Sequence, residues 1–208
     1  MPRPADPAVR EKLLAMAAEV LATDGPKALT TRRLATEAGT STMAVYTYFG
    51  SMDELRRELR RDGFAYVCTA IDAVPRTDDA VADLATVVDA YVALGADNPA
   101  WYRALFIDLP PEHDDHLGVG VHQRLVALLD RCVDTGRFSR PEPAGGHLWA
   151  AEVWLAAHGV VHLTQSRLLP AEALNHLQGD MLFRLCVGFG DRPELARASI
   201  DSSLTPPA

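Results

Sequence analysis

The sequence has no long apolar run and no paired cysteines. None of its segments approaches the roughly 18 to 20 consecutive apolar residues that a membrane-spanning helix needs. Residues 1–6 hold two prolines and no apolar stretch of the kind found in secretory signals. Cys68, Cys132 and Cys186 form no CxxC pair, which favours small buried hydrophobic residues, with a reactive thiol as the alternative. We therefore expect a cytoplasmic protein with no membrane partner.

The sequence also lacks the motifs that are typical of enzymes and cofactor sites. It contains no GxGxxG, no GxSxG and no Walker A loop. His158 and His162 stand four residues apart, a spacing that can hold zinc, but no HExxH motif surrounds them and no third ligand is evident. We therefore expect no enzymatic activity, no cofactor and no metal, and we interpret these histidines as core or interface residues.

Acidic residues outnumber basic ones, which by itself argues against a nucleic-acid partner. The net charge is −8, from 20 Lys and Arg against 28 Asp and Glu. The excess lies beyond residue 62, because residues 1–62 carry 10 basic and 9 acidic residues. A near-neutral first part can still bind phosphates if its basic residues share one face.

Proline, glycine and aspartate clusters divide the chain into segments of helical length, and almost none shows the alternation of a strand. The pattern predicts an all-α protein of about nine helices. We expect a helix-turn-helix domain over residues 1–51, a larger helical domain over 52–190 and a loose tail over 191–208. The expected helices cover residues 7–23, 30–38, 42–49, 52–73, 80–96, 100–107, 115–135, 147–167 and 171–189.

Two short helical segments flank Gly39. Thr30 can cap the first, and Ser41 can cap the second, which ends before Gly50. Glycine at the break supplies the left-handed backbone that a tight turn requires. This arrangement is typical of a helix-turn-helix, whose second helix enters the major groove of DNA. The alternative is an ordinary helical bundle in which the aromatic residues of this segment form a core.

The second short segment, residues 42–49, has two different faces. Val45 and Phe49 lie four residues apart and can pack together against the preceding helices. The opposite face offers small and hydroxyl side chains that suit close approach to base edges and phosphates. With the start of the preceding segment, the residues expected to contact DNA are Thr31, Arg32, Arg33, Thr42, Met43, Ala44, Tyr46, Thr47 and Tyr48.

Residues 30–55 resemble the TetR family of bacterial transcription regulators. The shared pattern is Thr30-Thr31-Arg32, Leu34-Ala35, Ala38-Gly39, Tyr46 with Phe49, and Asp53-Glu54-Leu55. The resemblance implies a three-helix DNA-binding head, a helical ligand domain and a homodimer on a palindromic double-stranded operator. The family usually has a phosphate-binding lysine where this chain has Met52, which puts one phosphate contact in doubt, although backbone N–H groups there could still serve. Thr40 also replaces a common aliphatic residue.

The second half of the chain resembles a subset of TetR regulators with a Trp-His-Gly C-terminal domain. Trp154, His158 and Gly159 carry this likeness, as does the segment 98–102. It implies that the last two long helices pair with their symmetry mates. A pocket for a small-molecule effector would be lined by apolar and aromatic groups with a few polar anchors. The candidates are Trp101, Tyr102, Phe106, His122, Trp149, Trp154, His158 and His162, each of which could instead be a core or interface residue.

These features predict a ligand-responsive DNA-binding regulator, in which an apolar effector releases a repressor from its operator. Two alternatives stay open. One is a regulator that activates or that senses no small molecule. The other is an all-α binding protein or enzyme whose first domain no longer binds DNA, an alternative that only Met52 supports.

Overall fold

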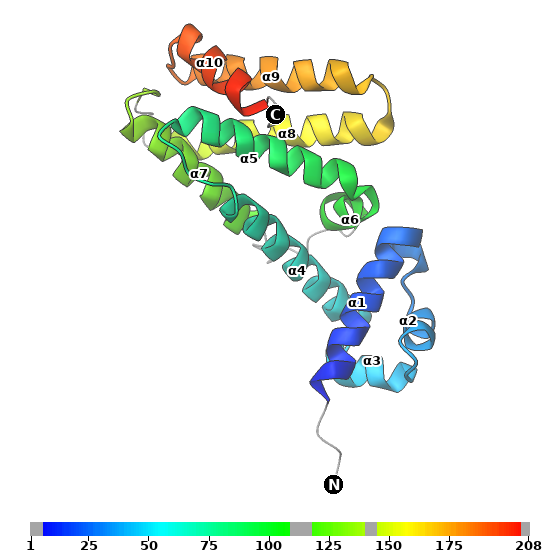
Figure 1. The fold of residues 1–208 in the computed structure, drawn as a ribbon. Helices are drawn as coiled ribbons and strands as arrows, with labels where there is room; N and C mark the ends of the chain where they lie inside the picture. Colours follow the sequence, from blue (N-terminus) through cyan, green and yellow to red (C-terminus); the bar gives the residue numbers. More distant parts are fainter. Residues whose placement is uncertain (1–5, 109–117, 140–144, 205–208) are drawn as a thin grey trace. The chain divides into compact units, whose positions relative to one another are not determined.

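The structure is a computed structural model that describes residues 6–108, 118–139 and 145–204, and the described residues form helices and connecting turns without a strand (Figure 1). This confirms the expected all-α fold. The α-helices are α1 (Pro7–Asp24), α2 (Thr31–Glu37), α3 (Thr42–Phe49), α4 (Met52–Asp72), α5 (Ala80–Asp97), α6 (Pro99–Arg103), α7 (Val119–Asp134), α8 (Gly145–Ser166), α9 (Ala171–Gly188) and α10 (Pro193–Leu204). Short 3-10 and π turns are η1 (Pro26–Ala28) and η2 (Ala104–Asp108).

The described chain forms two compact units. The first unit comprises residues 1–65 and 98–117, and the second comprises residues 66–97 and 118–208. This division differs from the expected boundary between residues 51 and 52, because most of α4 and all of α6 pack within the first unit. The sequence pattern did not reveal that α6, distant along the chain, lies against α1.

The first unit is built on α1, α2, α3, the larger part of α4, and α6. Pro7 begins α1 after Asp6, whose carboxylate accepts a hydrogen bond from the backbone N–H of Ala8 at 3.0 Å. Gly25 ends the helix with φ of +78°. The core of this unit joins buried side chains from all of its first four helices: Leu13, Ala17, Leu34, Ala35, Val45, Phe49 and Leu55.

The second unit consists of the end of α4 together with α5, α7, α8, α9 and α10. α5 is buried over much of its surface, and it contacts α7, α8 and α10. α8 and α9 lie side by side and run in opposite directions (Figure 1). Among the described residues, no helix combines the length and the apolar character needed to cross a membrane.

The expected loose tail over residues 191–208 is wrong, because α10 occupies most of it. Ala196 and Ile200 lie four residues apart, and both are fully buried in a helix that packs on α5 and α9. Asp191, also buried, accepts hydrogen bonds at 2.9 and 2.8 Å from the guanidinium of Arg137. The same guanidinium donates to the hydroxyl of Ser199 at 3.0 Å. This polar cluster and the burial of Ala196 and Ile200 hold α10 against the rest of the second unit.

The buried cysteines confirm the expectation of small hydrophobic residues at two of the three positions. Cys132 and Cys186 are fully buried, and burial raises the pKa of each thiol to about 12. Since the thiolate is the reactive form, neither residue has the character of a nucleophile. Cys68 is partly exposed, and burial also raises the pKa of its thiol.

Candidate DNA-binding helix and ligand cavity

The turn between α2 and α3 is stabilised by capping at both helix starts. The Thr30 hydroxyl accepts a hydrogen bond from the backbone N–H of Arg33 at 3.3 Å, and the Ser41 hydroxyl accepts one from that of Ala44 at 3.1 Å. Gly39 adopts φ of +64°, a left-handed conformation that costs glycine little. The backbone N–H of Thr40 then donates to the Ala35 carbonyl at 2.8 Å. These local interactions confirm the expected helix-turn-helix geometry.

The inner face of α3 anchors this short helix to the first unit. Val45 is fully buried, Phe49 is 4% exposed, and both belong to the core that Leu13 and Leu34 share. A helix of this length is marginal alone, so these contacts rather than intrinsic propensity keep it formed. The sequence prediction of this inner face is confirmed.

The outer face of α3 is open to solvent. Met43 is 71% exposed and Tyr46 is 49% exposed. Thr42 and Thr47 are also exposed, while Ala44 is half-buried. The Thr47 hydroxyl donates to the Met43 carbonyl at 2.9 Å, which leaves its oxygen available as an acceptor. The face therefore presents a thioether, a phenol and hydroxyls that can approach an external surface.

The two arginines of α2 differ in their availability. Arg32 is exposed and makes no ion pair with a described residue. Arg33 pairs with Asp24 and, through its Nε at 2.8 Å, with Glu37, and these hydrogen bonds raise the pKa of its guanidinium. A phosphate that bound Arg33 would therefore compete with two carboxylates, whereas Arg32 could bind a phosphate without breaking an ion pair. Thr31, the first residue of α2, is half-buried.

Tyr48 and the start of α4 already have partners within the first unit. Tyr48 is half-buried, and its hydroxyl accepts a hydrogen bond from the backbone N–H of Asp6 at 2.9 Å. The Ser51 hydroxyl caps α4 by accepting from the N–H of Glu54 at 3.0 Å. Asp53 and Glu54 occupy the first turn after Met52, where they already interact with the positive end of the helix dipole.

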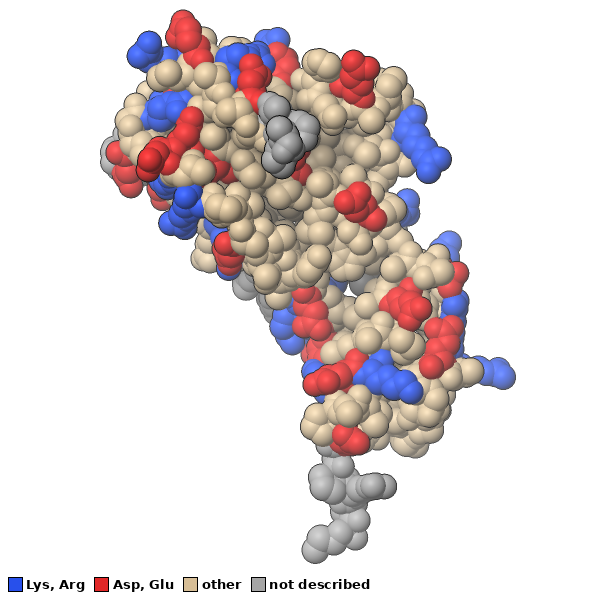
Figure 2. Space-filling model, viewed as in Figure 1, with Lys and Arg blue, Asp and Glu red and all other residues tan. Residues whose placement is uncertain are grey.

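Basic side chains form no broad patch on the visible face of the first unit. Figure 2 shows acidic and basic side chains interspersed there. The feature that distinguishes the α2–α3 segment is therefore the exposed outer face of α3, together with Arg32, rather than a large positive surface.

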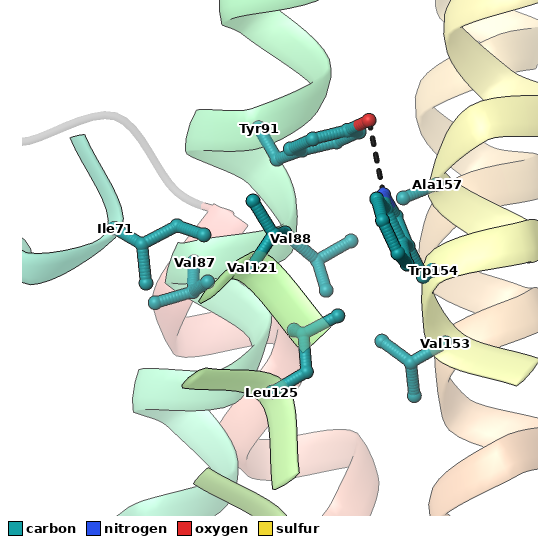
Figure 3. A pocket seen from close by; sticks show the side chains of 9 residues that line it. All are labelled: Ile71, Val87, Val88, Tyr91, Val121, Leu125, Val153, Trp154 and Ala157. Atoms are coloured by element: carbon teal, nitrogen blue, oxygen red, sulfur yellow. Dashed lines mark hydrogen bonds between the residues drawn. The ribbon is translucent and has the colours of Figure 1, made fainter. Parts of the chain in front are cut away.

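The second unit contains an apolar hollow, here called the Tyr91 hollow, whose wall includes Tyr91 and Trp154, joined by a hydrogen bond (Figure 3). The indole N–H of Trp154 donates to the Tyr91 hydroxyl at 3.1 Å, and that hydroxyl lies 3.2 Å from Nε2 of His158. The hollow has a volume of about 10 Å³, which is room for about one water molecule. Apart from the tyrosine and the tryptophan, its walls are aliphatic: Ile71, Val87, Val88, Val121, Leu125, Val153 and Ala157.

His158 is held neutral in this cluster. Its burial lowers the pKa of the imidazole from 6.5 to about 4. A neutral imidazole has one acceptor nitrogen, so the Tyr91 O–H can donate to it while the Tyr91 oxygen accepts from Trp154. The cluster therefore places a satisfied polar group at the edge of an apolar space, as in small-molecule sites.

The other pocket candidates are not brought together. Trp101, Tyr102 and Phe106 belong to the first unit, where Phe106 packs against Tyr102 with ring centroids 4.8 Å apart. Trp101 lines a separate hollow there, next to the buried Arg60.

Within the second unit, the remaining candidates have other surroundings. Nε2 of His122 lies 3.3 Å from Nδ1 of His147, and Trp149 stacks on Phe189 at 4.4 Å. His162 is exposed, and the described residues contain no cluster of three or more metal-ligating side chains. Among the eight candidates, Trp154 alone lines the Tyr91 hollow, and His158 adjoins it through its hydrogen bond with Tyr91. Tyr91 itself was missed, although it is the single aromatic residue in the apolar segment 80–96.

Two family models match the chain. The model described as bacterial regulatory proteins, tetR family, matches residues 13–59, which include α2 and α3. The model described as tetracyclin repressor-like, C-terminal domain, matches residues 84–187, which include Tyr91 and Trp154. No curated protein matches the chain.

Solved structures share the fold across most of the chain. A protein of unknown function from Rhodococcus sp. RHA1 has a TM-score of 0.77 at 20% identity, over 88% of this chain and 96% of that one. RolR in complex with resorcinol has a TM-score of 0.68 at 18% identity, over 97% and 96% of the two chains. FadR from Bacillus subtilis in complex with stearoyl-CoA has a TM-score of 0.71 at 16% identity, over 86% and 98%.

Proposed function

This chain belongs to the tetR family of bacterial regulatory proteins, whose members bind DNA, and we propose that it is a repressor that a small, largely apolar ligand releases from a palindromic operator. The observation that carries the proposal is the division of α3 into a buried inner face and an exposed outer face. Val45 and Phe49 hold the helix, while Met43, Tyr46 and Thr47 remain available for contact.

In this function α3 lies in the major groove. Thr47 and Thr42 can hydrogen-bond base edges or contact a thymine methyl, and the Tyr46 hydroxyl can reach a phosphate. Arg32 supplies a cation at the start of α2, and its exposure leaves it ready to contact the backbone. Affinity should therefore fall as the salt concentration rises, because bound counterions are released.

A homodimer formed through α8 and α9 would give the protein the two-fold symmetry of a palindrome. Leu148, Leu155 and His162 follow at seven-residue intervals along α8, and all three are exposed, with the leucines at 60% and 70%. Exposed Gly159 lies on the same side of the helix and would permit close approach of a partner helix. Two recognition helices must be held roughly 34–36 Å apart to read successive major grooves.

The ligand would bind by enlarging the Tyr91 hollow and would favour a conformation that does not fit the operator. A ligand shifts such an equilibrium only if it binds one conformation more tightly than the other. The resorcinol in RolR and the stearoyl-CoA in FadR are an aromatic and an acyl compound, and their presence in proteins of this fold supports a ligand with a substantial apolar part.

A gel-shift titration of the dimer against DNA from upstream of its own coding sequence tests the DNA-binding step. Tyr46→Ala should weaken binding at least several-fold, because it removes a large side chain from the outer face of α3. Tyr66→Ala is the matched control, since Tyr66 is 58% exposed on α4 but lies outside the helix-turn-helix. Wild-type affinity in the Tyr46 variant would refute the assignment of α3 as the recognition helix.

A further inference from the structure

Two histidines meet where α7 packs on α8. His122 lies in the first turn of α7 and is half-buried, while His147 lies in the first turn of α8 and is exposed. Nε2 of His122 is 3.3 Å from Nδ1 of His147, and the ring centroids are 5.5 Å apart. The rings therefore meet edge to edge, with one nitrogen of each between them. No local sequence pattern reveals this pair, because its members stand 25 positions apart.

The separation of the two nitrogens is the one that a shared metal ion requires. A Zn–N bond to an imidazole measures about 2.0 to 2.1 Å, so two such ligands of a tetrahedral zinc ion lie about 3.3 to 3.4 Å apart. The observed 3.3 Å falls in this range. The χ2 torsion of a histidine has broad minima. A tilt of the exposed His147 ring would therefore direct both lone pairs toward one ion.

The charges around the pair favour a cation. The acidic excess of the chain lies beyond residue 62, and both helices belong to that part. The Asp130 carboxylate of α7 also lies near the start of α8, since a Cβ added to Gly146, the neighbour of His147, would be 3.9 Å from its Oδ1. A carboxylate in this position raises the local concentration of cations. Two nitrogen ligands are thus combined with negative surroundings.

We propose that His122 and His147 bind one transition-metal ion, and that water completes its coordination. Imidazole nitrogen suits zinc, copper and nickel, whereas magnesium and calcium prefer oxygen ligands. The described residues supply no third ligand, so the ion exchanges with solvent, unlike the enclosed ion of a four-ligand structural site. Once bound, it joins α7 to α8 and stabilises the second unit. The site uses no residue of the proposed DNA-binding face or of the Tyr91 hollow.

Isothermal titration of the full chain with zinc tests the site. At about pH 7 the wild type should bind one zinc ion per chain, and His122→Gln or His147→Gln should weaken binding about tenfold or more. Losing only an outer partner of a metal ligand commonly costs about 10- to 100-fold, and these variants remove a ligand itself. The double variant should lose little more than either single one, because the ion needs both rings. His176→Gln is the matched control, an exposed histidine of α9 whose Nδ1 lies 2.8 Å from the Glu172 carbonyl oxygen.

Thermal unfolding gives a second readout of the same ion. Zinc at tenfold excess over its Kd should raise the melting temperature of the wild type and of His176→Gln by about 3 to 6 °C, and should leave that of His122→Gln unchanged. Magnesium should shift none of them. Zinc binding should also weaken as the pH falls from about 7 to about 5.5, because a protonated imidazole cannot ligate a metal.

Three results would overturn the proposal. One is a wild type that binds no zinc, another is a zinc affinity in His122→Gln or His147→Gln equal to that of the wild type, and the third is an equal response to magnesium. The pair would then be an ordinary N–H···N hydrogen bond between two helices. Because His147 is exposed, its replacement leaves the core intact, and the melting temperature of each metal-free variant verifies this.

Discussion

The buried, neutral His158 should make the second unit less stable in mildly acidic solution, because only the unfolded chain can protonate it there. The imidazole is held neutral beside Tyr91, and its burial lowers its pKa from 6.5 to about 4. Between these two values the unfolded chain binds a proton that the folded protein does not. Stability from this residue is therefore fully present above the ordinary pKa and is lost as the pH falls toward the folded value.

The size of the effect follows from the two pKa values. Near neutral pH both states are mostly unprotonated, and the residue has little influence. At about pH 5 the unfolded state is almost fully protonated while the folded state is not, which costs at most about 2 kcal/mol of unfolding free energy. For a domain of this size, such a loss is a large fraction of the total stability.

Urea unfolding at about pH 7 and about pH 5 measures this loss. His158→Gln keeps a hydrogen-bonding side chain next to Tyr91 but cannot titrate, so its unfolding free energy should fall by about 2 kcal/mol less than that of the wild type over this interval. His176→Gln serves as the control, because His176 is exposed outside this cluster and its replacement should leave the wild-type pH dependence in place. Identical losses in the wild type and His158→Gln would refute the reasoning.

Three further perturbations have definite expected outcomes. Met52→Lys should strengthen operator binding and steepen its salt dependence by about one unit of slope in a log–log plot, because one phosphate contact is added; an unchanged slope in gel shifts would contradict this. Leu155→Arg should convert a dimer to a monomer in light scattering, since the charge would enter the proposed α8–α9 interface, and a persistent dimer would exclude that face. Ile200→Ala should lower the free energy of urea unfolding by about 2 to 5 kcal/mol through the cavity it leaves in the core, whereas the exposed control Arg197→Ala should have a smaller effect.

The helix-turn-helix was predictable because its determinants are local. Thr30 and Ser41 each bond to a backbone N–H three residues away, and Gly39 adopts its left-handed conformation within the turn itself. The spacing of Val45 and Phe49 identified the buried face, since residues four apart on a helix point the same way. Each of these interactions joins residues that lie close together in the sequence.

The position of α10 could not be predicted in the same way. Its sequence mixes Leu195, Ala196 and Ile200 with charged and hydroxyl residues, and Gly190 and Pro193 are equally typical of a tail. Asp191 becomes a structural residue through Arg137, which stands 54 positions earlier in the chain. No local pattern reveals a partner at that separation.

The Tyr91 hollow shows the same limit most clearly. The sequence by itself determined the helical fold, the capped α2–α3 turn and the two faces of α3, because short-range hydrogen bonds and helical periodicity specify them. Tertiary structure alone decided that Tyr91 of α5 meets Trp154 and His158 of α8. It also decided that five other candidates lie elsewhere and that His162 is exposed. The physical reason is that a cavity is the space left between several packed helices, and its lining depends on how all of them fit together.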